Sequence, residues 1–276
     1  MSRAAKMANH MLQYILMLWM LSFPTFIALS VSKSRVLVFG ASRSAGMEVF
    51  KKLMKKSNVD VVGVVRSKRG VKSLKNIGAD DSQIRIADIT DREAIREVFR
   101  ESENCRVIFC ISSQPKRRLM SFVKSALFRV TSGKYKPKPG DFYFPHEATP
   151  YDINYVATKN CIDAAVSAKC EHFILLTCMG GYRQTELNEI GRSPSDEEKL
   201  GNIFKWRRAC ERYLMKRLFF TIIHSGTLTD ESGGNAEVVW DTDDALLRGG
   251  IKKISKVGNS PRDTFADLII QKFRRM

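Results

Sequence analysis

Residues 35–46 read RVLVFGASRSAG, and this stretch decides the fold of the chain. Four apolar residues lead to Gly40, small or polar residues follow as far as Gly46, and a helically periodic apolar segment begins at Val49. This order predicts a strand, a glycine turn and a helix whose first backbone amides would face a pyrophosphate. The turn supplies six candidate cofactor-binding residues: Gly40, Ser42, Arg43, Ser44, Ala45 and Gly46.

Apolar runs alternate with helical patterns along the rest of the chain, which has 276 residues. We expect further strands at residues 59–66, 84–88, 106–112, 172–177 and 220–226. Helices are expected around residues 71–76, 91–101 (capped by Thr90), 151–168 and 195–216, with a last helix carrying Phe265, Leu268, Ile269 and Phe273. The core face of the 151–168 helix would hold Val156, Cys161, Ala164 and Ala165. The pattern predicts an α/β fold: a Rossmann-type, doubly wound parallel sheet with helices on both faces and a short C-terminal extension on the substrate side.

The first 32 residues form a different kind of sequence. Arg3 and Lys6 precede an uncharged stretch with the apolar centre MLQYILMLWML, and Ala28 and Ser30 follow at the spacing that signal peptidase prefers. This pattern indicates a targeting segment over residues 1–32. The stretch is long enough for an uncleaved membrane anchor, but Pro24 and nearby polar residues favour a cleaved signal. Residues 33–276 would then form the NAD(P)-binding domain.

A dinucleotide-binding domain behind a secretory signal fits the ER lumen, or a plastid that is reached by bipartite targeting. The six cysteines are scattered, without CxxC spacing or clustered histidines, so we expect neither a metal site nor a disulfide framework. Unpaired cysteines favour a reducing compartment.

The formal net charge is +17, and much of it lies in a basic excursion over residues 113–150. No acidic residue occurs between Asn104 and Gly140, whereas nine basic residues do: Arg106, Lys116, Arg117, Arg118, Lys124, Arg129, Lys134, Lys136 and Lys138. A solvated face that attracts the phosphates of the cofactor would explain them. The alternative is contact of residues 116–138 with an anionic membrane surface or a protein partner. No nucleic-acid-binding module is recognisable, which argues against nucleic acid.

An amphipathic basic helix is predicted within this excursion. Apolar residues recur there at helical spacing: Leu119, Phe122, Val123, Ala126, Leu127 and Val130. We expect this stripe to pack on the body of its own domain, with a membrane-surface helix as the alternative. Residues 133–150 are rich in Pro, Gly and Lys and predict a long loop.

The ends of the next strands point to NADP(H) rather than NAD(H). Arg66 lies twenty residues past Gly46, where an NAD-dependent enzyme would place an acid, and Lys68 and Arg69 follow it. Together with Arg43, this guanidinium suits the 2′-phosphate of NADP(H). Four more residues complete the predicted cofactor site. Asp88 and Ile89 are expected near the adenine, and Ile111 and Ser112 near the ribose and nicotinamide.

At this point the chain resembles the atypical short-chain dehydrogenases of the NmrA-like, NAD(P)-binding type. The resemblance covers residues 35–243, with a fainter echo at PRDTFADLI, and rests on VLVFGASRSAG, VVGVVRSKRG, IADITD, YDINYVATKNCIDAAVSAKCEHFILLTCMGG and KWRRACERYLMKRLFFTIIHSGTLTDESGG. It implies a Rossmann core and NADP(H) binding, with either reductase chemistry or a non-catalytic role as a sensor or assembly factor. Many plastid proteins have this form. The chain departs from the family at Arg43, where members usually carry glycine, and at His224-Ser225-Gly226, where they carry arginine-proline-glycine.

The acid–base pair of typical family members is not evident. Tyr155 and Lys159 have the Tyr-x-x-x-Lys spacing, but they precede the fifth strand, so we interpret them as packing residues of a structural helix. After that strand the candidate catalytic residues are Thr177 and Tyr182. By resemblance, Arg207 stands where many members carry the lysine of the active-site helix.

Two functions from different classes therefore remain open. The chain is an NADP(H)-dependent oxidoreductase acting on an unknown small molecule, with Tyr182 or water supplying the proton. Alternatively, it is a non-catalytic NADP(H)-binding redox sensor or assembly factor that docks through its basic excursion. A third reading keeps only the scaffold, with Arg43 abolishing cofactor binding.

Overall fold

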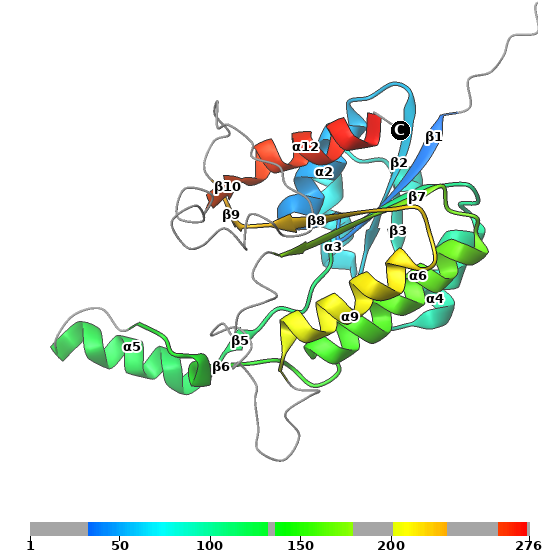
Figure 1. Cartoon of the computed structure of the whole chain (residues 1–276). Helices are drawn as coiled ribbons and strands as arrows, with labels where there is room; N and C mark the ends of the chain where they lie inside the picture. Colours follow the sequence, from blue (N-terminus) through cyan, green and yellow to red (C-terminus); the bar gives the residue numbers. More distant parts are fainter. Residues whose placement is uncertain (1–32, 132–135, 179–200, 231–258, 275–276) are drawn as a thin grey trace, which may run out of the picture. The chain divides into compact units, whose positions relative to one another are not determined.

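A six-stranded parallel sheet forms the centre of the fold (Figure 1). We describe it from a computed structural model, which describes residues 33–131, 136–178, 201–230 and 259–274. The strand order is β3-β2-β1-β4-β7-β8, the doubly wound arrangement that the sequence predicted. The strands are β1 (Ser34–Phe39), β2 (Val59–Val65), β3 (Ile84–Ile86), β4 (Arg106–Phe109), β7 (His172–Cys178) and β8 (Phe220–Ser225).

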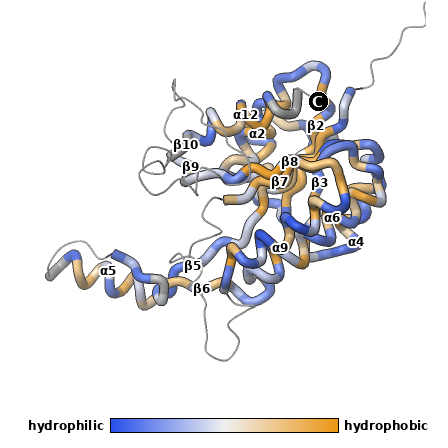
Figure 2. Tube along the Cα trace, viewed as in Figure 1, coloured by the Kyte–Doolittle hydropathy of each residue, from blue (hydrophilic) through white to orange (hydrophobic). Residues whose placement is uncertain are grey.

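Helices cover both faces of this sheet because successive strand residues point to opposite sides. In β1, Leu37 and Phe39 belong to one apolar cluster, and Val36 and Val38 belong to the other. The first cluster includes residues of α4 (Arg92–Arg100), α6 (Thr158–Ser167) and α9 (Ile203–Met215); the second includes residues of α2 (Ser44–Met54), α3 (Lys68–Lys75) and α12 (Arg262–Arg274). Figure 2 shows the hydrophobic residues concentrated along the strands between these layers.

Three phenylalanines tie adjacent strands together within the first cluster. The rings of Phe39 and Phe109 are 5.6 Å apart, and those of Phe109 and Phe173 are 6.0 Å apart, measured between centroids. All three are fully buried. They connect β1, β4 and β7, the strands whose carboxyl ends carry most of the predicted site.

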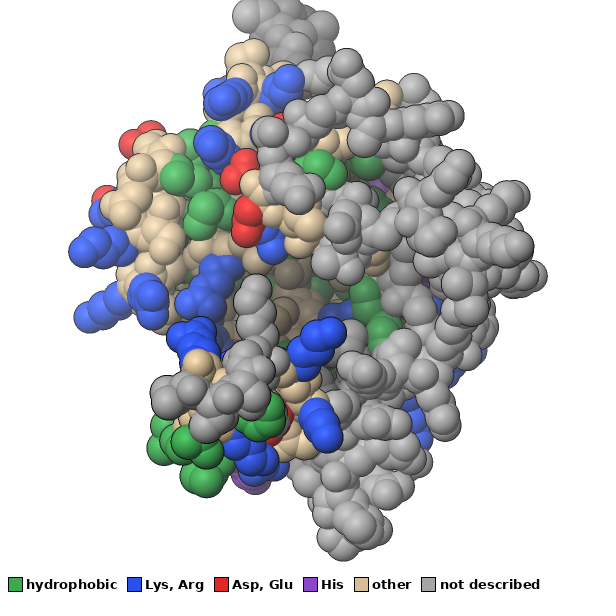
Figure 3. Space-filling model, turned by 90° about the vertical axis from the view of Figure 1, so that its left-hand side faces the viewer, with side chains coloured by type: hydrophobic (Ala, Val, Ile, Leu, Met, Phe, Trp, Pro, Cys, Tyr) green, Lys and Arg blue, Asp and Glu red, His purple; other side chains and the backbone are tan. Residues whose placement is uncertain are grey.

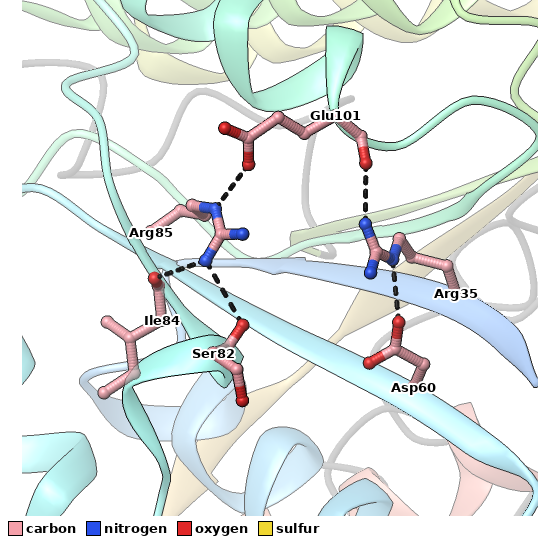
Figure 4. Close-up of polar contacts among 6 residues, drawn as sticks. All are labelled: Arg35, Asp60, Ser82, Ile84, Arg85 and Glu101. Carbon is pink, nitrogen blue, oxygen red and sulfur yellow. Dashed lines mark hydrogen bonds and ion pairs between the residues drawn. The ribbon is translucent and has the colours of Figure 1, made fainter.

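Two arginines, Arg35 and Arg85, link the first three strands to the residue that follows α4 (Figure 4). Arg35 Nε donates to Asp60 Oδ2 at 2.8 Å, and its Nη1 donates to the Glu101 carbonyl oxygen at 2.6 Å. Arg85 Nε donates to Glu101 Oε2 at 2.7 Å. Glu101 directly follows α4, so these partly exposed contacts join the first three strands to the end of that helix.

The predicted C-terminal helix is confirmed as α12, which packs on α2. Lys52 of α2 forms ion pairs with Asp263 and Asp267 at 2.8 and 2.6 Å. Phe265 and Ile269 are buried beneath them. Just before α12, the short strand β10 (Asn259–Pro261) pairs in parallel with β9 (Thr227–Thr229).

The largest differences from the expected strand ends are at β3 and β4, which end at Ile86 and Phe109 rather than at residues 88 and 112. The cap of α4 is Asp91, not Thr90, because Asp91 Oδ1 accepts from the amides of Glu93 and Ala94 at 3.0 Å. The Thr90 hydroxyl instead donates to Asp88 at 2.8 Å.

The helix expected at residues 151–168 begins as a π-helix, η3 (Tyr151–Ala157), and continues as α6. A π-turn holds more residues than an α-turn, so it rotates the side chains that precede α6 relative to a continuous α-helix. Val156 is exposed, and its assignment to the core was wrong; Ala157 is buried in its place. Cys161, Ala164 and Ala165 are buried as predicted.

The basic excursion contains the predicted amphipathic helix, α5 (Leu119–Thr131). It leaves the body of the fold (Figure 1), and its apolar side chains are exposed, so the expectation that they pack on the domain was wrong. The segment predicted as a long loop contains a short 3-10 turn, η2 (Pro139–Asp141), and β6 (Phe142–Tyr143). This strand pairs in antiparallel fashion with β5 (Lys116–Arg117).

Within the part of the chain that the structure describes, no helix is long and apolar enough to cross a membrane. The predicted targeting segment, Tyr182 and the expected helix start at residues 195–200 lie outside the described residues.

Candidate functional site

The carboxyl ends of the six strands bring the predicted site residues to one edge of the sheet. All strands run in parallel, so Gly40, Arg66 and Thr177 lie at or beyond the same ends although they are far apart in sequence. Strands β2 and β4 flank β1 on opposite sides, which makes β1–β4 the point where the chain order reverses. Ligands of open α/β sheets bind in the crevice outside such a switch point.

The turn after β1 requires both of its predicted glycines. Gly40 has φ +81°, and a Cβ on it would lie 3.0 Å from Ile111 Cγ1. A Cβ on Gly46 would lie 2.3 Å from the Gly40 carbonyl oxygen, closer than any real side chain permits. The start of α2 therefore packs directly against the end of β1.

The N-terminus of α2 suits an anion. Arg43, the cap residue, has an extended backbone and no side-chain capping hydrogen bond, and the first turn holds no acidic residue. The first amides of a helix have no partner within it, so a phosphate group fits here. Ala45 and Gly46 are buried in the turn, whereas Arg43 and Ser44 are exposed and Ser42 is half-buried.

Basic residues border this turn on the β2 side. Arg66, Lys68 and Arg69 are exposed where β2 leads into α3. A Cβ on Gly70 would lie 2.8 Å from Val65 Cβ and 3.3 Å from Ser42 Oγ, so the first turn of α3 packs against the glycine turn. The exposed basic run and Arg43 thus belong to two segments in direct contact.

The predicted adenine-side residues follow β3. Asp88 Oδ1 accepts from the Thr90 amide at 3.0 Å and from its hydroxyl at 2.8 Å. Ile89 is buried in the same cluster as Phe39 and Phe109. The turn after β3 is therefore fixed by its own hydrogen bonds and by core packing.

An arginine joins the ends of β4 and β7. The Arg207 guanidinium donates to Ser112 Oγ and to Cys178 Sγ. Beside Cys178, Thr177 is buried, and its Oγ1 has no hydrogen-bond partner in the described structure. Burial raises the pKa of Cys178, although Arg207 acts in the opposite direction, so the thiol stays protonated.

The side chain of Asn154, which the sequence analysis did not identify, holds the segment after Ser112. Asn154 Oδ1 accepts from the Ser113 amide at 3.1 Å, and Asn154 Nδ2 donates to Ser113 Oγ at 2.9 Å. Both residues are buried. Asn154 belongs to the π-helix, so this local distortion of the helix accompanies a contact with the site.

A buried carboxylate anchors α9 one turn beyond Arg207. Arg208 Nη1 donates to Glu211 Oε2 at 2.6 Å, and His224 Nε2 lies 3.3 Å from Glu211 Oε1. Burial would raise the pKa of Glu211, but His224 and Arg208 together hold it below its usual value. His224 lies opposite Thr177 in the β7–β8 register, so this cluster fixes α9 against the site edge. The sequence shows the Arg208–Glu211 spacing but not the partner from β8.

Tyr155 and Lys159 lie at the interface of η3 and α6 with α9. The Tyr155 ring contacts Trp206 at 5.6 Å between centroids. Lys159 Nζ lies 5.0 Å from the centre of the Tyr213 ring. Burial and a 2.5 Å hydrogen bond to Asp163 raise the pKa of Tyr213 to about 12. These contacts are those of packing residues.

Metal-binding side chains are not gathered in the described ranges: no three of His, Cys, Asp or Glu are placed to hold an ion. The six cysteines are free thiols.

Comparison with known proteins agrees with this fold. The family described as NAD(P)H-binding matches residues 40–271. An uncharacterized chloroplastic protein of Arabidopsis thaliana is 32% identical over 226 residues, covering 80% of this chain and 61% of that protein. Sanguinarine reductase of Eschscholzia californica is 29% identical over 227 residues, covering 79% and 78%. An anaerobillin reductase of Escherichia coli O157:H7 shares the fold, with a TM-score of 0.54, 17% identity and coverage of 86% and 89%.

Glu211→Gln is expected to lower the free energy of unfolding by about 1–3 kcal/mol near neutral pH, because Arg208 loses its buried counter-charge. Since the pKa of Glu211 is held below its ordinary value of 4.5, the carboxylate stabilises the fold above that pH, and the stabilisation is lost as the pH falls below it. Urea unfolding over this pH range measures the effect.

Glu97→Gln is the matched control, because its ion pair with Arg100 is exposed. It should change the free energy by less than about 0.5 kcal/mol. A difference between wild type and Glu211→Gln that stays constant with pH would contradict the role assigned to the carboxylate.

Proposed function

Since this chain belongs to the NAD(P)H-binding family of short-chain-dehydrogenase-like proteins, we propose that it is an NADP(H)-dependent oxidoreductase acting on a small molecule. The observation that carries the proposal is the edge of the sheet itself. An uncapped helix N-terminus and exposed arginines lie at one side of it. At the other side Arg207 binds Ser112 and Cys178, and the neighbouring Thr177 hydroxyl is buried without a hydrogen-bond partner in the described structure.

The residues present fit the dinucleotide. The amides of α2 would hold the pyrophosphate, and Arg43 and Arg66 would hold the 2′-phosphate through charge-assisted hydrogen bonds. This pair of guanidinium groups supports NADP(H) over NAD(H). The other predicted contacts would follow the sequence prediction. Around the pyrophosphate would lie Gly40, Ser42, Ser44, Ala45 and Gly46, at the adenine Asp88 and Ile89, and at the ribose and nicotinamide Ile111 and Ser112.

Bound NADPH would supply a hydride. Thr177 and Arg207 would bind the substrate oxygen on which negative charge develops, since a preorganised donor at that position stabilises the transition state. A guanidinium holds its proton at physiological pH, so Arg207 can bind the oxygen but cannot protonate it. The proton would come from Tyr182 or from water.

The relatives support the class of reaction and the compartment. One of them is named a sanguinarine reductase, which favours reduction of a small organic molecule. Another is named chloroplastic, which supports a plastid location over the ER lumen, reached through the targeting segment predicted in residues 1–32. Residues 33–276 would form the working domain, with residues 113–150 as its excursion.

A second candidate is a non-catalytic NADP(H)-binding redox sensor or assembly factor. It is favoured by Arg207, which by resemblance stands in the place of the lysine of the active-site helix and whose guanidinium already joins Ser112 and Cys178. Docking through the excursion at residues 113–150 would then be the function, and nucleotide binding would report the redox state.

Arg66→Ala is expected to weaken NADPH binding by about 10- to 100-fold, because a hydrogen bond between two charged groups contributes about 1.5–3 kcal/mol. NADH lacks the 2′-phosphate, so its affinity should not change. Calorimetric titration of both nucleotides measures the contrast, with Lys72→Ala at the other end of α3 as the control. Equal loss for both nucleotides would contradict the assignment, and no binding to the wild type would leave only the scaffold.

Arg207→Gln is expected to lower the rate of NADPH oxidation by about 100-fold, the usual effect of removing one oxyanion donor. The affinity for NADPH should stay within about twofold, because the residue faces the substrate oxygen. The assay uses sanguinarine and a panel of aldehydes and quinones, with exposed Arg212→Gln as the control on the same helix. Equal rates for variant and wild type would contradict the role of Arg207, whereas tight NADPH binding without any turnover would favour the second candidate.

A further inference from the structure

Helix α5 turns its apolar side to solvent. Leu119, Met120, Phe122 and Val123 are between 52% and 78% exposed, although they share one side of the helix. With about 100° between successive residues, the apolar positions of α5 other than Phe128 cover an arc of about 160°. A helix that packs on its own domain buries such an arc.

The polar side of the same helix is the one that is covered. Arg117 Nε donates to Ser121 Oγ at 2.7 Å, and its Nη2 donates to the Ser121 carbonyl oxygen at 2.9 Å and to Ser125 Oγ. Ser121 is fully buried. The strand that precedes α5 therefore satisfies the serine side and leaves the apolar arc facing outward.

Exposed cations accompany the arc, and Figure 3 shows hydrophobic side chains beside Lys and Arg on this part of the surface. Lys124 and Arg129 lie on the helix and Lys116 and Arg118 lie just before it, all of them exposed. Lys124 Nζ lies 3.8 Å from a carboxylate oxygen of Asp141, which is buried. The surface around α5 thus combines apolar and positive side chains.

We propose that α5 lies in the interface of a membrane that carries anionic lipids. The apolar arc would enter the boundary of the acyl chains, and the cations would contact the headgroup phosphates. A helix of 13 residues is about 20 Å long, which suits a helix lying in the plane of the interface and is too short to span the bilayer.

A flat lipid surface fits this helix better than a partner helix does. The seam of a helix pair uses a narrow stripe of two positions in seven, whereas the arc of α5 is far broader. The helix carries no acidic residue that could pair with a basic partner, and its cations match an anionic surface. Vesicle binding does not depend on the proposed hydride chemistry, so the two proposals fail separately.

Hydrogen exchange of the full-length protein tests this inference at the helix itself. The probes are phosphatidylcholine vesicles with and without about 30% phosphatidylglycerol, the anionic component that basic segments bind. We expect the amides of residues 119–131 to exchange more slowly only with the anionic vesicles. The double variant Leu119→Ser/Phe122→Ser should lose this protection, and Lys124→Gln/Arg129→Gln should weaken vesicle binding by about fivefold per charge, from ~1 kcal/mol each.

The matched control is Met215→Ser/Lys216→Gln, which removes an exposed apolar and an exposed basic side chain at the end of α9. It should leave the protection of α5 intact. Unchanged exchange in α5 while the full chain binds vesicles would overturn the proposal, because another segment would then make the contact. Protection that grows with protein concentration without vesicles would also overturn it and assign the face to a second copy of the chain.

Discussion

The contact between Gly46 and the Gly40 carbonyl oxygen is the constraint on which the site depends. A Cβ on Gly46 would lie 2.3 Å from that oxygen, so only glycine lets α2 begin directly at the end of β1. This close approach points the uncapped amides of α2 toward the switch point between β1 and β4. The neighbouring segments are then built around the turn, with Ile111 against Gly40 and the first turn of α3 against Ser42.

Much of the fold could be predicted because its signals are local. Buried parallel strands appear as short apolar runs, and all six were placed within a few residues of their ends. The misplaced features depend on contacts that a single segment does not reveal. The Thr90 hydroxyl donates to Asp88, so Asp91 is the cap of α4. The π-turn that exposes Val156 places Asn154 in contact with Ser113. The outward face of α5 results from Arg117, which covers the serine side of the helix.

The candidate site divides in the same way. Its nucleotide half lies in short stretches after β1 and β2, where residue type and spacing carry the chemistry, so glycines and arginines could be identified from sequence. Its reactive half is assembled from distant segments. Arg207 contacts Ser112, 95 residues away in the sequence, and Glu211 of α9 contacts His224 of β8. No periodicity links such residues, which is why the anchoring cluster was missed. The proposed site thus combines a nucleotide half of the Rossmann type with a substrate half in which Arg207 would bind the substrate.

The crystal structure of the full-length protein with NADP⁺ would test the central claim most directly, because it locates both halves of the site in one experiment. The account predicts the pyrophosphate at the first amides of α2, the 2′-phosphate within hydrogen-bond distance of Arg43 or Arg66, and the nicotinamide beside Ser112 and Arg207. A nucleotide bound away from this edge, or a nicotinamide displaced from Arg207, would contradict it.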